Sequence, residues 1–506
     1  MTTNVLSYLK RAAQTAPEHC ALADSVRAYS YVRLWRIVCA LGAELSRLLG
    51  GARRRPVLVA IDRSARTPAA CYGVVSSGNF YVPLDLSLPE KRLRDIYETM
   101  QPAAIVLAAE GAQRPAFMTC PAVELPENAE AADETVAERA IAEGLDTDPL
   151  YCIFTSGSTG VPKGVLVSHR SVIDMAEQFT AAFGFDGQTV FGNQAPFDFD
   201  VSVKDLYLAL RSAATVQILE KQLFLMPKRL VARLNERRVD TLIWAAAAMK
   251  ILSSLRTFDS VVPEHLRRVM FSGELLPCKV LNDWRRHMPS ADYVNLYGPT
   301  EITCNCTYYR VDRAYADDEV LPIGRPFGNS GVFLCRDGAA VTEPGEVGEL
   351  CVRGTCLALG YYANPEKTAE AFCQSPLQAQ WPERIYRTGD LAKYLPDGNL
   401  LFVGRADSQI KHMGHRIELG EIEVAANALP EVQYACCLHD AARERIVLFC
   451  QAQEDDPRRL LRRLRERLPE YMLPNRVVFL ETMPANRTGK IDRALLRAQY
   501  IKEQTP

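Results

Sequence analysis

Short apolar runs alternate with longer amphipathic stretches through the first 400 residues or so. The runs are rich in β-branched residues and lie at 57–61, 103–109, 215–220, 240–246 and 267–273. Buried parallel strands have this continuous apolar character and are joined by helices, so the pattern predicts an α/β architecture with largely parallel sheets. At 506 residues the chain is too long for one hydrophobic core, and we expect two or more domains.

The pattern changes in the C-terminal third. Near residue 330 turn signals become denser and the strands between them shorter, which predicts a β-rich subregion. After about residue 406 a compact tail has its own strand run at 445–453 and an amphipathic helix at 457–468. One face of that helix carries leucines, and six arginines surround it; the leucines are Leu460, Leu461, Leu464 and Leu468. The tail therefore predicts a small C-terminal domain.

The composition excludes several classes of protein. With 48% hydrophobic and 24% charged residues and a net charge of -2, nothing favours nucleic acid or a membrane as a partner. The N-terminus lacks the features of a signal peptide, and no apolar run approaches the roughly 18 residues of a membrane span, so we expect a cytoplasmic protein. The fifteen cysteines include no CxxC pair and the seven histidines no HExxH spacing, which predicts free, mostly buried thiols.

The stretch YCIFTSGSTGVPKGVLVSH (151–169) is rich in small residues between two apolar runs. Glycines permit tight turns in which backbone N–H groups can hold phosphate oxygens, and Lys163 adds a positive charge. The spacing is not that of a Walker loop, because Gly164 follows the lysine. From these residues alone, a phosphate loop and a structural turn remain equally open.

The order of several further motifs gives a resemblance that covers nearly the whole chain. FTSGSTGVPKGV is followed by NLYGPTEIT (295–303), GELCVRGTCLALGYYANPEKT (348–368), YRTGDLAKYLPDGNLLFVGRADSQIKHMGHRIELGEIE (386–423), LPEYMLP (468–474) and NRTGKIDR (486–493). The chain resembles the adenylate-forming superfamily: acyl-CoA and aryl-CoA synthetases, luciferases and the adenylation domains of nonribosomal peptide synthetases. The resemblance implies a large N-terminal domain (1–406) of α/β sheet subdomains plus a β-rich subregion. A small mobile α+β domain (407–506) would follow, with its hinge at Asp407.

The resemblance also implies which residues bind ATP and Mg²⁺. Tyr297 would lie against the adenine, Asp390 and Arg405 would contact the ribose, and Glu301 would help to place Mg²⁺. Lys490 would bridge the substrate carboxylate and the α-phosphate, and would act in catalysis with Thr300 and Glu301. The full implied ATP-binding set is Thr155, Ser156, Gly157, Ser158, Thr159, Gly160, Lys163, Asn295, Leu296, Tyr297, Gly298, Pro299, Thr300, Asp390, Arg405 and Lys490.

The segment APFDFDVSVKDLYLAL (195–210) bears on which acid is activated. Amino-acid-activating members carry a Phe-Asp pair here, whose aspartate binds the substrate α-ammonium, and Asp200 fits this role better than Asp198. Many relatives have an apolar or aromatic residue at the position of Lys204. If the lysine points into the pocket, it would favour a substrate with an acidic side chain. If it points outward or pairs with an acid of the protein, it would leave a site for a small neutral amino acid. The implied pocket consists of Asp200, Val201, Lys204, Ala245, Met270, Ser272, Leu296, Cys304 and Asn305.

The resemblance implies two half-reactions. The carboxylic acid first reacts with ATP to give an acyl-adenylate, and a thiol then captures the acyl group. The chain ends about a dozen residues after NRTGKIDR, with no carrier segment, and so resembles free-standing ligases that load an amino acid onto the phosphopantetheine arm of a separate carrier protein. The leading hypothesis is therefore an AMP-forming amino-acid ligase. A CoA ligase for a small or aromatic acid, and a non-catalytic nucleotide-binding relative, are the alternatives.

Overall fold

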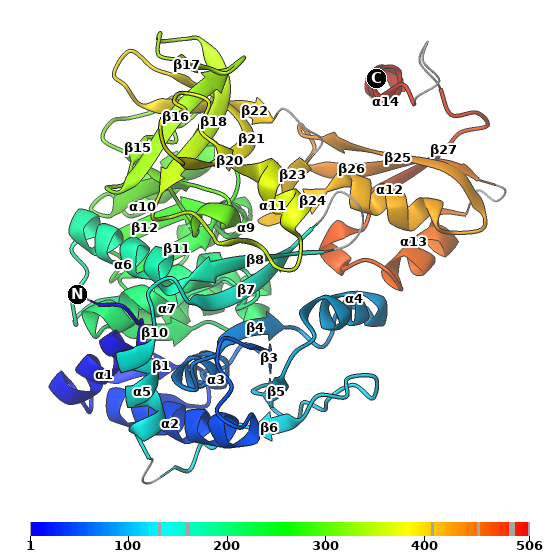
Figure 1. Cartoon of the computed structure of the whole chain (residues 1–506). Coiled ribbons are helices and arrows are strands. Elements are labelled where there is room, and N and C mark those ends of the chain that lie inside the picture. The colour runs from blue at the N-terminus through cyan, green and yellow to red at the C-terminus, as the bar shows by residue number, and fades with distance from the viewer. Residues whose placement is uncertain are drawn as a thin grey trace. The chain divides into compact units, whose positions relative to one another are not determined.

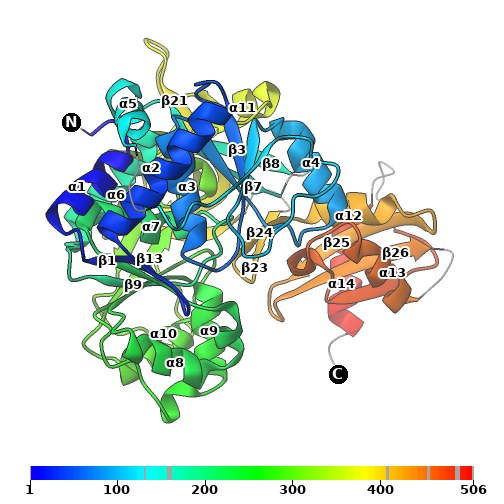
Figure 2. The ribbon, with the colours of Figure 1, turned by 90° about the horizontal axis from the view of Figure 1, so that it is seen from below.

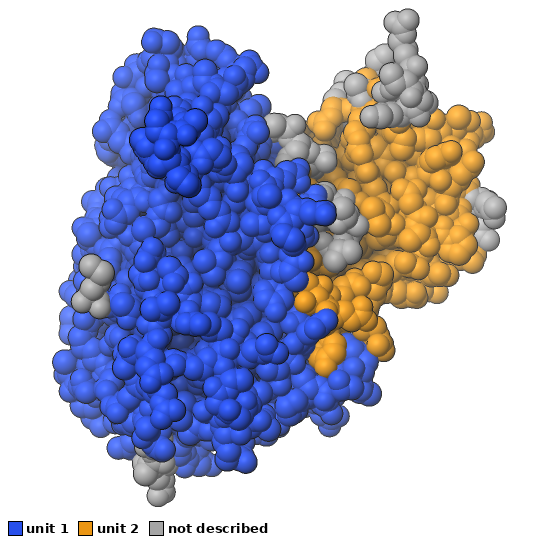
Figure 3. All heavy atoms as spheres, in the orientation of Figure 1, with its two compact units in different colours: residues 1–86, 100–153, 164–406 blue, residues 87–99, 154–163, 407–506 orange. Residues whose placement is uncertain are grey.

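The computed structural model describes residues 2–129, 133–156, 162–405, 409–452, 456–484 and 491–503. The chain divides into two compact units, which Figure 3 shows in blue and orange. Unit 1 consists of residues 1–86, 100–153 and 164–406, and unit 2 of residues 87–99, 154–163 and 407–506. Unit 2 thus combines the C-terminal segment with two short segments from earlier in the sequence.

The first sheet of unit 1 is mostly parallel and has the strand order β15-β14-β13-β12-β11-β9-β10-β1-β2. Helices α8, α9 and α10 lie together on one side of this sheet (Figure 2). Their leucines pack against Trp244 of β11 and Phe271 of β12. The strands are β1 (Cys20–Ala23), β2 (Ala28–Ser30), β9 (Val190–Asn193), β10 (Thr215–Ile218), β11 (Thr241–Ala245), β12 (Arg268–Ser272), β13 (Asp292–Tyr297), β14 (Thr307–Arg310) and β15 (Arg325–Pro326).

A second sheet of unit 1 has the order β19-β8-β7-β4-β3-β5-β6. One hydrophobic core joins it to the first sheet through α1, α2, α3, α6 and α7 (Figure 1). The strands are β3 (Pro56–Ala60), β4 (Phe80–Leu84), β5 (Ala104–Leu107), β6 (Ala122–Glu124), β7 (Pro149–Thr155), β8 (Lys163–Ser168) and β19 (Gly360–Tyr361). The helices of unit 1 are α1 (Leu6–Thr15), α2 (Tyr31–Leu48), α3 (Arg66–Ser76), α5 (Thr135–Glu143), α6 (His169–Phe183), α7 (Val201–Ser212), α8 (Pro227–Glu236), α9 (Ala246–Ser254), α10 (Cys278–His287) and α11 (Pro365–Ala371).

The third sheet of unit 1 is antiparallel and is the β-rich subregion predicted near residue 330. Its order is β17-β16-β18-β21-β20, with β22 also paired to β21. The strands are β16 (Ser330–Arg336), β17 (Ala339–Val341), β18 (Val347–Gly354), β20 (Phe372–Gln374), β21 (Arg384–Tyr394) and β22 (Leu400–Arg405).

Unit 2 is an α+β structure around its own core. It contains a β-hairpin, β23-β24, and a sheet of order β25-β26-β27. Its elements are β23 (Gln409–His412), β24 (His415–Glu418), α12 (Leu419–Asn427), β25 (Val432–Asp440), β26 (Arg445–Ala452), α13 (Pro457–Arg465), β27 (Arg476–Phe479) and α14 (Arg493–Glu503), together with most of α4 (Glu90–Met100).

Most of the predicted elements are confirmed. The five apolar runs form β3, β5, β10, β11 and β12, each with parallel neighbours. The helix predicted at 457–468 is α13, but it ends at Arg465, and Leu468 still reaches the core from the following turn. All fifteen cysteines lie among the described residues and are free, most of them buried. No helix in the described ranges is long and apolar enough to cross a membrane.

Candidate active site

Four residues of the implied pocket share one face of the first sheet. In the parallel register Ala245 lies opposite Ser272, and Met270 lies opposite Val294. Leu296 follows Val294 by two residues, and side chains two apart on a strand point to the same face. This face is opposite to the one that packs Trp244 and Phe271, because those residues alternate with the pocket residues. The strand register therefore brings together side chains that are 51 residues apart, from Ala245 to Leu296.

Asp200 lies at the N-terminus of α7, over that face. It occupies the N-cap position without making a side-chain cap hydrogen bond, and it is 6% exposed. The preceding residues form a turn in which Phe199 N–H donates to the Pro196 carbonyl at 3.1 Å. The segment is therefore no strand, and Asp198 and Asp200 differ in environment: Asp200 is buried, while Asp198 is partly exposed. This difference favours Asp200 as the carboxylate of the pocket.

Lys204 follows Asp200 by one helical turn and is fully buried. Its Nζ donates to Asn305 Oδ1 at 2.7 Å and to Ser272 Oγ at 3.5 Å. Burial lowers the pKa of Lys204, and the nearby Cys304, Asp200 and Asp205 oppose that shift. The outward-pointing orientation, which the sequence left open, is therefore wrong, and three residues of the implied pocket make direct contact.

Arg63 anchors the loop that leads to Asp200. Its guanidinium donates to the carbonyls of Leu219, Asn193 and Ala195 and to Asn193 Oδ1. It also lies 5.5 Å from the centroid of the Phe197 ring. These bonds join the ends of β9 and β10 to the turn that carries Asp200, so a single partly buried cation fixes the backbone from which the carboxylate projects. No feature of the sequence around Arg63 predicted this role.

Asp205 is buried behind the pocket and accepts a hydrogen bond from Asn193 Nδ2 at 2.8 Å. Burial raises the pKa of Asp205 from 3.8 to about 7, although the bond to Asn193 and the charges of Lys204 and Arg63 oppose the shift. Between these two values the unfolded chain has lost the proton and the folded chain keeps it. The contribution of Asp205 to the free energy of unfolding therefore falls as the pH rises from about 4 to about 7.

We expect Asp205→Asn to remove this pH dependence, because asparagine is neutral throughout and can still accept from Asn193. Relative to the wild-type chain, the variant should gain free energy of unfolding as the pH rises. Urea unfolding of both chains at about pH 5 and about pH 8 measures the difference. If the two chains differed in free energy of unfolding by the same amount at both pH values, the raised pKa of Asp205 would be contradicted.

Tyr297, Asp390 and Arg405 converge at another point of unit 1. Asp390 on β21 lies directly opposite Arg405 on β22, and the guanidinium donates to its Oδ1. The Tyr297 hydroxyl, at the end of β13, donates to the other carboxylate oxygen. Burial raises the pKa of Tyr297 well above its usual value. The residues implied for adenine and ribose binding thus form one hydrogen-bonded group, although more than 90 residues separate Tyr297 from its partner Asp390.

The segment after Tyr297 links this group to the pocket. A Cβ on Gly298 would lie 2.6 Å from Asn305 Cα, so no side chain fits there. Thr303 and Cys304 both have left-handed backbone, with φ of 57° and 76°, and the Cys304 thiol donates to the Asp200 carbonyl at 3.2 Å. Such strain persists only where surrounding contacts hold it. The turn that follows the nucleotide motif therefore also places Asn305 against Lys204.

Glu301 and Thr300 are buried in the short helical turn Thr300–Ile302. The Tyr361 hydroxyl donates to Glu301 Oε1 at 2.8 Å, and Ala358 N–H donates to the Glu301 carbonyl at 2.9 Å. Asn295 lies two residues before Tyr297 on β13, and its Nδ2 donates to the Pro322 carbonyl at 2.8 Å. Tyr361 was not among the predicted site residues, although it lies in the quoted motif GYYANPEKT.

The described ends of the glycine-rich stretch belong to unit 2. Ser156 Oγ donates to the Arg416 carbonyl at 2.7 Å and accepts from Glu418 N–H at 3.2 Å. Lys163 Nζ lies 3.9 Å from Glu418 Oε1. Thr155 Oγ1 lies 3.5 Å from the Lys163 carbonyl. Both ends of the stretch therefore have partners on β24, within the motif GHRIE.

Comparison with known proteins places the chain in a family. Residues 9–362 match the AMP-binding enzyme family, and residues 421–490 match the AMP-binding enzyme C-terminal domain. The chain belongs to the AMP-binding enzyme family. The resemblance to adenylate-forming enzymes that the motifs gave is thereby confirmed, as is the fold that it implied.

Among its relatives, bacitracin synthase 1 of Bacillus licheniformis is 31% identical over 498 residues, which are 96% of this chain and 9% of the synthase. The chain thus spans a small part of that relative's length. The solved structure of IdnL1 is 28% identical, with a TM-score of 0.82 and coverage of 95% of this chain and 98% of IdnL1. The structure of holo-PA1221, an NRPS protein containing adenylation and PCP domains, has the same fold, with a TM-score of 0.84 at 23% identity over 98% of this chain and 84% of that one.

Several predicted residues of this AMP-binding enzyme lie outside the described residues. They are Gly157, Ser158, Thr159 and Gly160 of the glycine-rich stretch, the expected hinge Asp407 and the expected catalytic Lys490. Their roles stay predictions from the family motifs.

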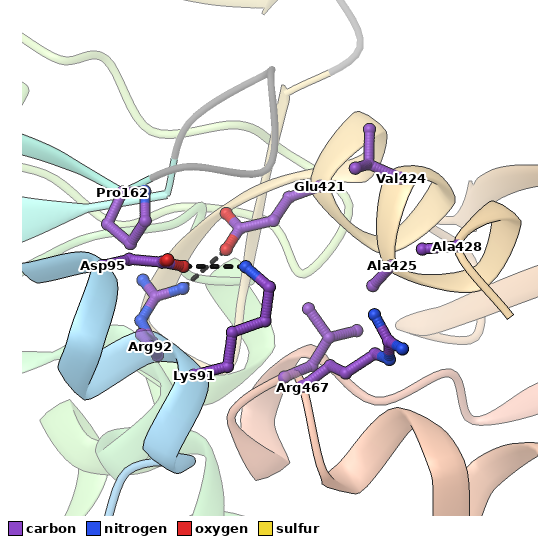
Figure 4. Close-up of a pocket in the computed structure, with 10 residues that line it drawn as sticks. Lys91, Arg92, Asp95, Pro162, Glu421, Val424, Ala425, Ala428 and Arg467 are labelled. Atoms are coloured by element: carbon purple, nitrogen blue, oxygen red, sulfur yellow. Dashed lines mark hydrogen bonds and ion pairs between the residues drawn. The ribbon is translucent and has the colours of Figure 1, made fainter.

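Unit 2 of this AMP-binding enzyme also contains a small pocket of about 60 Å³ between α4 and α12 (Figure 4). Arg92 Nη1 lies 2.5 Å from Glu421 Oε1, and both side chains are buried. Lys91 pairs with Asp95 at 2.9 Å. Glu421 and Asp95 thus balance two of the three cations that line the pocket, and Arg467 is the third.

Proposed function

We propose that the protein activates an amino acid as its aminoacyl-adenylate at the expense of ATP, and then transfers the aminoacyl group to the phosphopantetheine thiol of a carrier protein. Family membership supports the adenylation. The buried carboxylate of Asp200, at the N-terminus of α7 and beside the pocket residues, is the observation that favours an amino acid over other carboxylic acids as substrate. A substrate α-ammonium is a cation that such a buried carboxylate can bind.

In the first half-reaction a substrate carboxylate oxygen attacks the α-phosphorus of ATP. The bond from that phosphorus to the bridging oxygen breaks, and pyrophosphate leaves with the electron pair. Asp200 would hold the α-ammonium so that the carboxylate faces the phosphorus. Thr300 and Lys490 would donate to the α-phosphate oxygens as charge increases on them, so they would act by positioning and electrostatic stabilisation.

The nucleotide would bind against Tyr297, with its ribose hydroxyls hydrogen-bonded to Asp390 and Arg405. The three residues already form one hydrogen-bonded group, which supports a shared ligand. Glu301 is suited to holding Mg²⁺, because Mg²⁺ is commonly bound by one or two carboxylates together with substrate phosphates. Bound Mg²⁺ would neutralise phosphate charge; Tyr361 would keep the Glu301 carboxylate in place through its hydrogen bond.

For the second half-reaction we propose a separate acidic carrier protein as the acceptor. Helix α13 exposes Arg458, Arg459, Arg462 and Arg465, and such a basic surface accelerates association with an acidic partner. Holo-PA1221, which shares the fold, contains adenylation and PCP domains in one protein. In the transfer the carrier thiolate attacks the acyl carbon, a thioester forms, and AMP leaves.

Amino-acid-dependent exchange of labelled pyrophosphate into ATP tests the adenylation step directly. We expect exchange with an amino acid and none with the corresponding acid that lacks the α-amine, because only the former can pair with Asp200. Exchange only with acids that lack an α-amine would contradict the proposal and favour a CoA ligase. ATP binding without exchange for any acid would favour a non-catalytic nucleotide-binding protein.

A further inference from the structure

The implied pocket contains a buried cation for which the proposed reaction has no use. Lys204 is fully buried, whereas lysine is almost never buried without a partner. The α-ammonium of an amino acid would pair with Asp200, and its α-carboxylate would face ATP. Neither group of the substrate backbone therefore serves Lys204.

The protein partners of Lys204 are neutral. An ammonium group has three N–H donors. Asn305 Oδ1 at 2.7 Å and Ser272 Oγ at 3.5 Å accept two of them. In the parts of the chain that the structure describes, no carboxylate forms an ion pair with Lys204. The third donor has no acceptor among these contacts, and the charge of Lys204 is offset only from beyond ion-pair distance, by the Asp200 and Asp205 carboxylates.

Asp205 does not form an ion pair with Lys204. Its Oδ2 accepts from Asn193, and its Oδ1 is buried without a hydrogen-bond partner. Because burial raises the pKa of Asp205 to about 7, its negative charge is incomplete at neutral pH. Burying a cation with no ionic partner is costly, so a ligand that supplies a carboxylate at this position would gain affinity.

The spacing fits a short dicarboxylic amino acid. Asp200 and Lys204 are four residues apart at the start of α7, and side chains with this spacing lie on the same face of a helix. A carboxylate at the N-terminus of the turn and an ammonium one turn later can face opposite ends of the same small molecule. Asn305 and Ser272 hold the lysine ammonium in place through their hydrogen bonds to Nζ.

We propose that Lys204, together with Asn305 and Ser272, binds the side-chain carboxylate of the substrate, and that the protein activates an acidic amino acid of the aspartate or glutamate type. This inference rests on the proposed function, because it assumes that an amino acid binds with its ammonium at Asp200.

Pyrophosphate exchange with isosteric pairs tests the inference on the unmodified chain. We expect aspartate or glutamate to exceed the matching amide in kcat/KM by about 10- to 100-fold, the value of a hydrogen bond to a charged group. Strongest exchange with a small neutral amino acid, or equal exchange with acid and amide, would overturn it while leaving the proposed function intact. No exchange with any amino acid would instead contradict the proposed function.

Two variants locate the effect at Lys204. Lys204→Met keeps the length of the side chain without its charge and should abolish the preference for acid over amide. Asn305→Asp is nearly isosteric and gives the lysine an internal counter-charge, so it should also shift the preference toward the amide, with the fold retained. Lys228→Met, an exposed lysine on α8, is the matched control and should leave the preference unchanged. An unaltered preference in both pocket variants would overturn the inference.

Discussion

Replacing Lys490 with alanine is expected to slow aminoacyl-adenylate formation roughly 10²- to 10³-fold, the effect of removing one donor aimed at charge that develops in a transition state. The lysine would contact the α-phosphate and the substrate carboxylate only in the adenylation step. ATP affinity should therefore change little. Single-turnover formation of the adenylate measures the first effect, and ATP titration by calorimetry measures the second.

Arg487→Ala is the matched control for Lys490, because it removes a positive charge from the same motif, NRTGKIDR. We expect this control to keep most of the adenylation activity. Near-normal adenylation by the Lys490→Ala variant would remove the central role that the family motif implies for this residue. A large loss of ATP affinity would instead mean that the lysine contributes to nucleotide binding in the ground state.

Asp200→Asn is expected to reduce kcat/KM for the amino acid by roughly 10²- to 10³-fold, because truncating one side of a buried charge pair leaves the other charge unpaired. Asparagine has nearly the same shape. Asp200 makes no side-chain cap hydrogen bond to α7, so the substitution removes no helix cap. A melting temperature close to that of the wild-type chain should accompany the loss of activity.

Asp198→Asn provides the control for Asp200. Asp198 lies two residues earlier in the same turn, but it is partly exposed. We expect this variant to keep the KM for the amino acid and the exchange rate near those of the wild-type chain. Equal losses in both variants would mean that the turn, and not one carboxylate, determines activity. A loss only in Asp198→Asn would transfer the role in ammonium binding to Asp198.

The sequence determined the family and the main architecture without help from the structure. Ordered motifs from FTSGSTGVPKGV to NRTGKIDR identify the superfamily because phosphate and nucleotide contacts need particular local residues at particular local spacings. The strands β3, β5, β10, β11 and β12 were predictable for a similar reason: a strand buried on both faces must be apolar along its whole length. Tyr297, Asp390 and Arg405 could be named from their motifs, but their mutual hydrogen bonds could not.

Only the tertiary structure decided the environment of Lys204. Whether a lysine is buried depends on what packs over it, and the groups that bind Nζ come from Ser272 and Asn305, 68 and 101 residues away. The same holds for Arg63, whose acceptors are main-chain carbonyls that no sequence pattern reveals. It also holds for the different burial of Asp198 and Asp200, which lie in one turn at the start of α7. The order of residues determines which chemical groups lie close together along the chain, whereas burial and long-range partners arise only when distant segments pack together.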